Sequence, residues 1–333
     1  VAADIGLIPC PFTSELNYLA AEDFRGFPPP RPVAAHKGSF GHLVIIAGTF
    51  GYHGAAVLAA RGAQRAQPGL ITLVTSPNVY VPVAAQLQST MVQPWVHRLE
   101  LPNTCTGLLV GPGLAAPEAP EDLKAMVRQL WERSSLAIVI DASALDWLPA
   151  GQGPSGAVRL ITPHLGEAGR LLGMTSAEVQ QDRRAAWREL SRRYGCRVAL
   201  KGHQTLIGQD KEKSQELPGA TVFDRRPRTR QGSEPAGEPA ARAGAAPAGY
   251  VPDSAFESLC VNCSGNPHLA QGGSGDLLSG YLAGLLAQPP LQQEPAKTIC
   301  YGVWQHGAAA DALQERQRGW TVEDLAQMLG RVP

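Results

Sequence analysis

The chain lacks the features that mark membrane-bound, secreted or nucleic-acid-binding proteins. Its Lys+Arg and Asp+Glu totals are 29 each, so the formal net charge is +0 and no overall field attracts nucleic acid or an anionic membrane. No apolar run approaches the length of a bilayer span. No basic segment followed by an apolar one marks a secretory signal. We therefore expect a cytoplasmic protein that binds neither membranes nor nucleic acids.

Cysteine is also sparse and scattered. Of the 6 cysteines, Cys260 and Cys263 form the one C-x-x-C pair, and no second pair or histidine pair stands at zinc spacing. Free thiols in a reducing compartment are therefore a better interpretation than a metal or redox centre.

Short apolar runs alternate with helical patterns from residue 43 onward. Strands are predicted over 43–47, 70–75, 106–110, 136–141, 158–162, 198–201 and 205–207, and helices over 54–67, 121–133, 175–194, 276–287, 297–315 and 321–330. Continuous apolar strands separated by helices imply crossover connections and a mostly parallel sheet with helices on both faces. Ligands in such α/β sheets bind at the carboxyl ends of the strands.

Two segments depart from this pattern. Residues 1–35 are rich in proline and are expected to form an extended lead-in. Residues 209–253 are rich in Pro, Ala, Gly, Arg and Glu, which predicts a disordered insertion, since so little apolar surface cannot offset the entropy cost of ordering. Because the insertion follows Lys201 closely, we expect it beside the ligand site.

A glycine cluster carries the strongest chemical signal, in Gly265-Asn-Pro-His-Leu-Ala-Gln-Gly-Gly-Ser-Gly-Asp276. Glycines let the backbone turn tightly and direct amides outward, and the helix that follows adds its positive end. An acid at the first turn, Asp276, would then take a proton from an alcohol that is being phosphorylated. The alternative is an ordinary helix start whose acid only complements the helix dipole.

Four more loops follow predicted strands and would reach the same edge of the sheet. Gly48-Thr-Phe-Gly-Tyr-His-Gly54 is either a simple turn or a backbone cradle, and Gly111-Pro-Gly113 would let a flat ligand lie on the backbone. In Thr162-Pro-His-Leu-Gly-Glu167, the spacing of His164 and Glu167 puts both on one face of a helical turn. Lys201 is either solvated or in contact with a nucleotide phosphate.

Seven motifs occur in a family-specific order, and together they resemble the NAD(P)H-hydrate dehydratases, a branch of the ribokinase-like fold. They are His36-Lys-Gly-Ser-Phe-Gly-His-Leu-Val-Ile-Ile-Ala-Gly48, Gly51-Tyr-His-Gly-Ala55, Gly111-Pro-Gly113, Asp141-Ala-Ser-Ala-Leu145, Thr162-Pro-His-Leu-Gly-Glu167, Leu200-Lys-Gly-His-Gln-Thr205 and the Gly265–Asp276 segment. The resemblance implies a three-layer α/β/α domain over 36–333. It also implies that the S-form of hydrated NADH or NADPH is phosphorylated on its ring hydroxyl and loses phosphate to restore the reduced nucleotide.

The resemblance further implies a role for each matching position. Asp276 would contact the hydroxyl as general base, and Ala55, Gly113 and His164 would border the hydrated dinucleotide. The anion hole would consist of Gly272, Gly273, Ser274 and Gly275. The adenine nucleotide would be held by Lys201, Gly202, His203, Gln204, Thr205 and Gly275. Mg²⁺ is expected with the nucleotide, with Glu167 ordering its water shell through a water-mediated contact.

The same resemblance suggests the donor, the assembly and the context of the domain. The Lys-Gly-x-x-Thr pattern favours ADP as phosphoryl donor, with ATP as the alternative, and a homotetramer is expected. Ala3-Asp-Ile-Gly-Leu-Ile-Pro9 resembles the closing strand of an NAD(P)H-hydrate epimerase domain, so such a domain is expected upstream. Two other functions stay open: a ribokinase-like kinase of a vitamin precursor such as hydroxymethylpyrimidine, thiazole or pyridoxal, and a non-catalytic dinucleotide-binding module.

Overall fold

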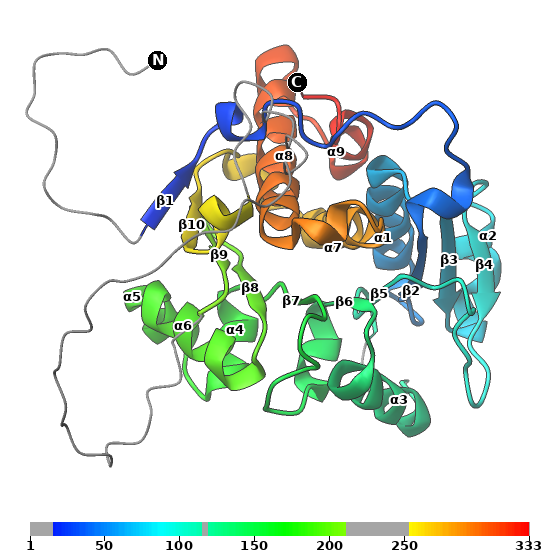
Figure 1. The fold of residues 1–333 in the computed structure, drawn as a ribbon. Helices are drawn as coiled ribbons and strands as arrows, with labels where there is room; N and C mark the ends of the chain where they lie inside the picture. The colour runs from blue at the N-terminus through cyan, green and yellow to red at the C-terminus, as the bar shows by residue number, and fades with distance from the viewer. Residues whose placement is uncertain (1–15, 115–118, 211–252, 333) are drawn as a thin grey trace, which may run out of the picture.

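The computed structural model describes residues 16–114, 119–210 and 253–332, which form a ten-stranded sheet with helices on both faces (Figure 1). The strands are β1 (Leu16–Leu19), β2 (His42–Ile46), β3 (Leu70–Thr75), β4 (Met91–Pro94), β5 (Gly107–Val110), β6 (Ala137–Ile140), β7 (Arg159–Ile161), β8 (Arg197–Leu200), β9 (Thr205–Gly208) and β10 (Leu259–Asn262). The α-helices are α1 (His53–Ala66), α2 (Tyr80–Ala84), α3 (Glu121–Arg133), α4 (Leu165–Leu172), α5 (Ser176–Gln181), α6 (Arg183–Tyr194), α7 (Ser274–Leu286), α8 (Pro295–Arg316) and α9 (Val322–Met328).

The strand order is β1-β10-β9-β8-β7-β6-β5-β2-β3-β4. All neighbouring strands are parallel except at β9, which is antiparallel to both β8 and β10. The predicted mostly parallel α/β architecture is therefore confirmed. The long crossovers bring the ends of β2, β5, β6, β7 and β8 to one edge of the sheet, which we call the carboxyl edge.

Each face of the sheet has its own apolar core, because successive side chains of a strand point to opposite faces. In β2, Leu43 and Ile45 join the core under α1, α7, α8 and α9, whereas Val44 and Ile46 join the core under α3, α4 and α6 (Figure 1). All four side chains are fully buried, which explains why this strand reads as a continuous apolar run rather than an alternating one.

Helices α1 and α7 touch backbone to backbone. A methyl group built at Gly62 of α1 would overlap the carbonyl oxygen of Leu277, and one built at Gly280 of α7 would overlap that of Ala59. A built Cβ at Gly284 would lie 2.7 Å from Cβ of Ala66. Only glycine permits this approach, so the small residues of both helices fix the height of α7 above the sheet.

The described part of the predicted lead-in packs on the domain. Strand β1 pairs in parallel with β10, and the rings of Phe24 and Phe27 are buried against α8 residues, with Phe24 5.6 Å from Tyr301 between ring centroids. The sequence predicted neither β1 nor β10, because Leu-Asn-Tyr-Leu and Leu-Cys-Val-Asn lack a continuous aliphatic run. The expected epimerase-like segment 3–9 lies outside the described residues.

The predicted long helix over 175–194 is two helices. Thr175 and Glu178 form the expected capping box, with the Glu178 amide donating to Oγ1 of Thr175 at 3.2 Å. The chain then breaks at Asp182, whose carboxylate accepts the Ala185 amide at 2.9 Å and starts α6. A side chain that caps a new helix competes with continuation of the old one.

The predicted insertion lies almost wholly outside the described residues, but its attachment points are described. Asp210 pairs with Arg192 of α6 at 2.7 Å, and the chain resumes before β10. The register pairs Asn262 with Thr205 and Cys260 with Ile207, so both attachment points lie at the end of the strands opposite Lys201. The two attachment points are therefore remote from Lys201, whereas the expected position of the segment itself, beside the ligand site, falls outside the described residues. Within the described ranges, no helix has the length and apolar character needed to cross a bilayer.

The backbone contact between α1 and α7 predicts a strong response to one methyl group. Gly280→Ala should lower the free energy of unfolding by about 1–3 kcal/mol through overpacking, against a gain of about 1 kcal/mol in helix propensity. Gly54→Ala is the matched control, since nothing lies within 4 Å of a Cβ built there. Urea unfolding of both variants tests the contact, and equal stability of the two would contradict it.

Candidate active site

The loops after β2 and β5 are hydrogen-bonded to each other at the carboxyl edge. The Gly48 amide donates to the Pro112 carbonyl at 2.9 Å, and the Thr49 hydroxyl donates to the Gly113 carbonyl at 2.8 Å. Gly113 has a φ of +63°, and a Cβ built on it would lie 2.9 Å from Cβ of Ala55. The structure thus makes Ala55 and Gly113, both predicted to border the dinucleotide, direct neighbours.

A buried carboxylate and a lysine meet where β6 and β8 end. Asp141 is buried, and its Oδ1 lies 2.8 Å from Nζ of Lys201. The Lys201 amide donates to the Pro163 carbonyl at 2.8 Å, which ties the end of β8 to the loop after β7. Lys201 is therefore ion-paired and half-buried, so the alternative of a simply solvated lysine does not apply.

His164 and Glu167 form a reciprocal cap at the start of α4. Nδ1 of His164 accepts the amides of Gly166 and Glu167 at 3.0 and 3.2 Å, and Glu167 Oε2 accepts the His164 amide at 2.8 Å. Because Nδ1 accepts hydrogen bonds, the neutral ring must carry its proton on Nε2, which lies 3.4 Å from Glu167 Oε1. The two side chains are in contact, but not as one face of a helical turn: His164 is the extended residue that caps α4 and is exposed, whereas Glu167 lies within the helix and is buried.

The start of α7 carries the predicted anion hole and Asp276. Gly273 has a φ of +90°, and a methyl group built on it would overlap Leu58 of α1. A Cβ built at Gly275 would lie 3.4 Å from Nζ of Lys201, so the first turn of α7 faces the Lys201–Asp141 pair. The Ser274 amide donates to the Gln271 carbonyl at 3.3 Å. The next amides of this turn have no acceptor within the helix, as an anion site requires.

The surroundings of Asp276 favour its protonated form. Burial and the nearby Asp141 carboxylate, with a smaller contribution from Glu167, raise the pKa of Asp276 to about 6, although Lys201 opposes the shift. Burial alone would lower the pKa of Lys201, but Asp141, Glu167 and Asp276 together raise it. Lys201 therefore stays cationic, and Asp276 is poised to gain or lose a proton near neutral pH.

A buried histidine on α8 lies behind the start of α7. Nε2 of His306 lies 3.4 Å from the hydroxyl of the buried Ser274. Burial lowers the pKa of His306 to about 4, so the ring is neutral and contributes a hydrogen bond rather than a charge. The Ser274 hydroxyl thus faces α8, and its side chain ties the first turn of α7 to that helix.

The loop that follows β8 is held by an arginine that the sequence did not single out. The Arg183 guanidinium of α6 donates to the carbonyls of Leu200 at 3.3 Å and Gln204 at 3.1 Å, and also to that of His203. It supports the exposed segment 202–204, in which Gln204 has a φ of +58°. No local sequence pattern could have indicated Arg183, because its partners are carbonyls of another element.

The carboxylates near Lys201 could supply oxygen ligands, directly or through water, to a divalent cation that is also bound by phosphate. Asp141, Glu167 and Asp276 act together on the single ammonium of Lys201, which leaves an excess of negative charge on oxygen donors. No cluster of three or more metal-ligating side chains occurs within the described ranges. Mg²⁺ fits such a donor set, since it usually takes one or two carboxylates, phosphate oxygens and water.

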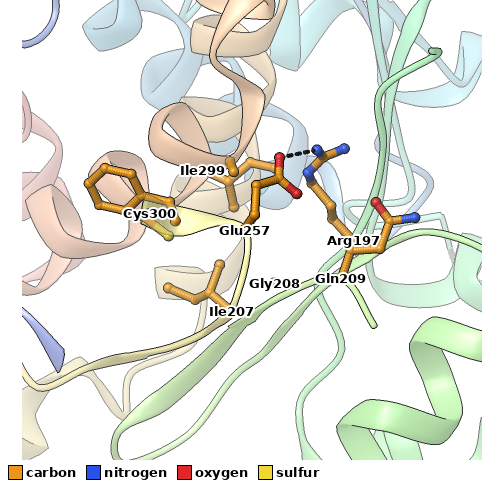
Figure 2. A pocket seen from close by; sticks show the side chains of 9 residues that line it. Arg197, Ile207, Gly208, Gln209, Glu257, Ile299 and Cys300 are labelled. Carbon is orange, nitrogen blue, oxygen red and sulfur yellow. Dashed lines mark hydrogen bonds and ion pairs between the residues drawn. The ribbon is translucent and has the colours of Figure 1, made fainter. Parts of the chain in front are cut away.

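Two hollows in the described structure lie away from these residues. The one in Figure 2 is lined by Arg197, Ile207, Glu257 and Cys300 among others, at the strand end opposite Lys201. Its volume is about 10 Å³, which is room for roughly one water molecule. A groove of about 450 Å³ between segment 95–100 and α3 includes none of the predicted site residues.

The mostly parallel sheet with helices on both faces is the ribokinase-like α/β fold. A solved ribokinase-like superfamily protein from Enterococcus faecalis V583 matches with a TM-score of 0.69 and 21% identity over 96% of both chains. The family model described as NAD(P)H-hydrate dehydratase matches residues 43–221 and 254–331. The chain belongs to the NAD(P)H-hydrate dehydratase family.

Individual relatives agree with this assignment. The ADP-dependent (S)-NAD(P)H-hydrate dehydratase of Neisseria meningitidis serogroup B is 31% identical, with 84% of this chain and 80% of the relative covered. The bifunctional NAD(P)H-hydrate repair enzyme Nnr of Vibrio cholerae is 34% identical over 89% of this chain and 50% of its own length. The chain thus spans about half the length of that bifunctional relative. The ADP/ATP-dependent NAD(P)H-hydrate dehydratase of Bacillus subtilis, co-crystallised with ATP and Mg²⁺, shares the fold with a TM-score of 0.69, 24% identity and coverage of 95% and 96%.

The raised pKa of Asp276 predicts a pH-dependent stability difference that needs no activity assay. The folded protein holds this proton more tightly than the unfolded chain, because the pKa rises from 3.8 to about 6. Ionised Asp276 therefore costs stability above the folded pKa, and the cost disappears as the pH falls toward the unfolded value. Asp276→Asn should be more stable than the native chain at pH 8, and the difference should shrink at pH 4.5.

Thermal unfolding at the two pH values measures this difference. Asp146→Asn is the matched control, since Asp146 is exposed and its ion pair with Arg170 is long, at 3.5 Å. A stability difference for Asp276→Asn that does not change with pH would contradict the assigned environment.

Proposed function

We propose that the chain dehydrates the S-form of hydrated NADH and NADPH at the expense of an adenine nucleotide, which restores the reduced nucleotide. The observation that carries the proposal is the position of Asp276, half-buried in the first turn of α7 and facing the Lys201–Asp141 pair. An acid with a pKa near 6 beside a helix start suits proton removal from an alcohol during phosphoryl transfer.

In the proposed reaction, the ring hydroxyl attacks the terminal phosphoryl group of the nucleotide while Asp276 takes the hydroxyl proton. With ADP as donor, the phosphorus–oxygen bond to the leaving group breaks and AMP departs. The phosphate then leaves with the electrons of the carbon–oxygen bond, and loss of a ring proton restores the dihydronicotinamide. The backbone of Gly272, Gly273, Ser274 and Gly275 would bind the transferred group, since helix-terminal amides favour developing negative charge.

The two substrates would approach from opposite sides of Asp276. Ala55, Gly113 and His164 would border the hydrated dinucleotide, in keeping with the close contact of Ala55 and Gly113. Lys201, Gly202, His203, Gln204, Thr205 and Gly275 would hold the adenine nucleotide, in keeping with the exposure of segment 202–204. ADP is the favoured donor, because the Neisseria relative is an ADP-dependent enzyme, and ATP is the alternative.

Mg²⁺ would neutralise charge on the nucleotide phosphates. Glu167 would order its water shell. A carboxylate has about four lone-pair positions, and the hydrogen bond and ion pairs of Glu167 with His164 and Lys201 leave room for water. Lys201 would stay beside these oxygens as a fixed positive charge.

The setting of the domain also belongs to the proposal. We place the protein in the cytoplasm as a homotetramer. Segment 1–35 would correspond to the tail of an epimerase domain, as the bifunctional relatives suggest. The domain proper would then span 36–333.

Recovery of the reduced-nicotinamide absorbance tests the function directly. The chain is mixed with S-form NADH hydrate, Mg²⁺ and either ADP or ATP. Turnover with ADP is expected, and Asp276→Asn should lower kcat by about 10²–10⁴-fold, which is the contribution of one positioned proton acceptor. Nucleotide affinity of the variant should stay within a few-fold of native.

Other outcomes would redirect the assignment. Turnover with ATP alone would change the donor. No turnover by folded protein would reject the dehydratase, and phosphorylation of a vitamin precursor or bare dinucleotide binding would then be measured.

Arg183 provides a separate test of the nucleotide loop. Arg183→Lys cannot reach three carbonyls at once, so the KM for ADP should rise roughly tenfold with little change in kcat, the loss expected for about 1.5 kcal/mol of charge-assisted hydrogen bonding. Arg170→Lys, at an exposed position, is the control. An unchanged KM would remove this loop from the nucleotide site.

A further inference from the structure

The glycine segment that leads into α7 is fastened to α8 at its entrance. The Ser264 hydroxyl donates to the Trp304 carbonyl at 2.8 Å, and a methyl group at Gly307 would overlap Ser264. One turn further along α8, Asp311 Oδ2 accepts the Gly265 amide at 2.7 Å. These α8 positions lie on one face of the helix, so the entrance is held against a rigid element.

Asp311 makes a second hydrogen bond that extends along the segment. Its Oδ1 accepts from Nδ2 of Asn266 at 3.1 Å, and Oδ1 of Asn266 accepts the His268 amide at 3.1 Å. The two ends of the Asn266 amide are therefore committed to different partners. The carboxylate of Asp311 and the orientation of Asn266 depend on each other.

The path continues to the first residue of α7. The His268 carbonyl accepts from Nε2 of Gln271 at 2.7 Å, and the Gln271 carbonyl accepts the Ser274 amide at 3.3 Å. A continuous series of hydrogen bonds thus joins Asp311 to Ser274. His306 then contacts Ser274 from the same helix, so α8 holds both ends of the glycine segment.

We propose that Asp311 is a positioning residue that fixes the glycine-rich anion hole at Gly272 to Gly275 through Gly265 and Asn266. The inference rests on the proposed function, because it concerns the site of phosphoryl transfer. Asp311 touches neither substrate in this assignment. Its effect is to hold backbone amides where charge develops, and a misplacement of about 1 Å can cost roughly 100-fold in rate.

The pattern of donors and acceptors predicts that exchanging the acid or the amide alone, at position 311 or 266, breaks a hydrogen bond. In Asp311→Asn, the new amide group can accept from Gly265 only if its Nδ2 faces Nδ2 of Asn266. A flip of Asn266 relieves that conflict but turns its Nδ2 toward the His268 amide. In Asn266→Asp, two carboxylates face each other. Each single variant therefore loses a hydrogen bond that no rotation restores.

The exchanged pair Asn266→Asp with Asp311→Asn restores every hydrogen bond. Asn at 311 accepts the Gly265 amide and donates to Asp at 266, which accepts the His268 amide with its other oxygen. We expect each single variant to lower kcat roughly 100-fold with the KM for ADP nearly unchanged. The double variant should return to within threefold of native.

Asp210→Asn is the matched control, since it removes an ion-paired aspartate at the far end of the sheet, 2.7 Å from Arg192. Its kcat should equal that of the native chain. Hydrogen exchange of a peptide covering 263–276 provides a readout without turnover: exchange should speed up in the single variants, slow again in the double variant and stay native in the control.

Each result decides the proposal. Single variants with native kcat, or a folded double variant as slow as the singles, would overturn it, as would single variants whose only change is a lower Tm. If the native chain does not turn over hydrate, the proposed function fails, and the exchange data alone decide whether Asp311 fixes the segment.

Discussion

The approach of α1 to α7 at backbone contact distance is the constraint on which the rest of the site depends. Gly62 and Gly280 allow it, and no other residue would fit at either position without displacing a helix. Since α1 begins at the loop after β2 and α7 begins at the glycine segment, the two helix starts are fixed relative to each other. Ala55 and Asp276 are therefore held by helix packing more than by the loops that carry them, and packed helices place such groups more reproducibly than loops do.

The charges at the carboxyl edge are arranged at some cost to stability. Three carboxylates act on one lysine, and the strong Lys201–Asp141 pair leaves Asp276 as the acid that the cluster accommodates least well. A well-paired Asp276 would make a more stable fold but a weaker base, because its pKa would fall. The arrangement is typical of a functional site, where local stability is lost and the surrounding structure compensates. The buried His306 is neutral, so it supports the start of α7 through Ser274 without adding a further charge to this edge.

The sequence predicted the central strands, the edge of the sheet that carries the loops and the glycine motif, because each depends on local pattern. Strand β2 is apolar on both faces, and Thr162 to Glu167 places its polar groups where a parallel strand must end. It did not predict β1, β4 or β10, whose sequences Leu-Asn-Tyr-Leu, Met-Val-Gln-Pro and Leu-Cys-Val-Asn lack the continuous aliphatic run that marked β6, a strand of the same length. Arg183 and Asp311 were also missed. Arg183 begins α6 and Asp311 lies inside α8, and the groups that they bind belong to other elements.

The described loops are hydrogen-bonded to one another at both ends of the sheet, and at the end opposite Lys201 the Gly69 amide donates to the Phe40 carbonyl at 3.0 Å. At the carboxyl edge, the loops after β2, β5, β7 and β8 are joined to one another by backbone and side-chain hydrogen bonds. At the opposite end, residues 211–252 connect Asp210 to the start of β10, and the antiparallel register of β9 with β10 holds regardless of that length. Loop-closure entropy grows only slowly with length, so a long connection costs little where no site depends on it. Because β9 is antiparallel to β8, the chain returns to the end of the sheet opposite Lys201 directly after the segment 201–205. The antiparallel strand β9 therefore places the long connection between β9 and β10 at the end of the sheet opposite the residues that would carry the chemistry.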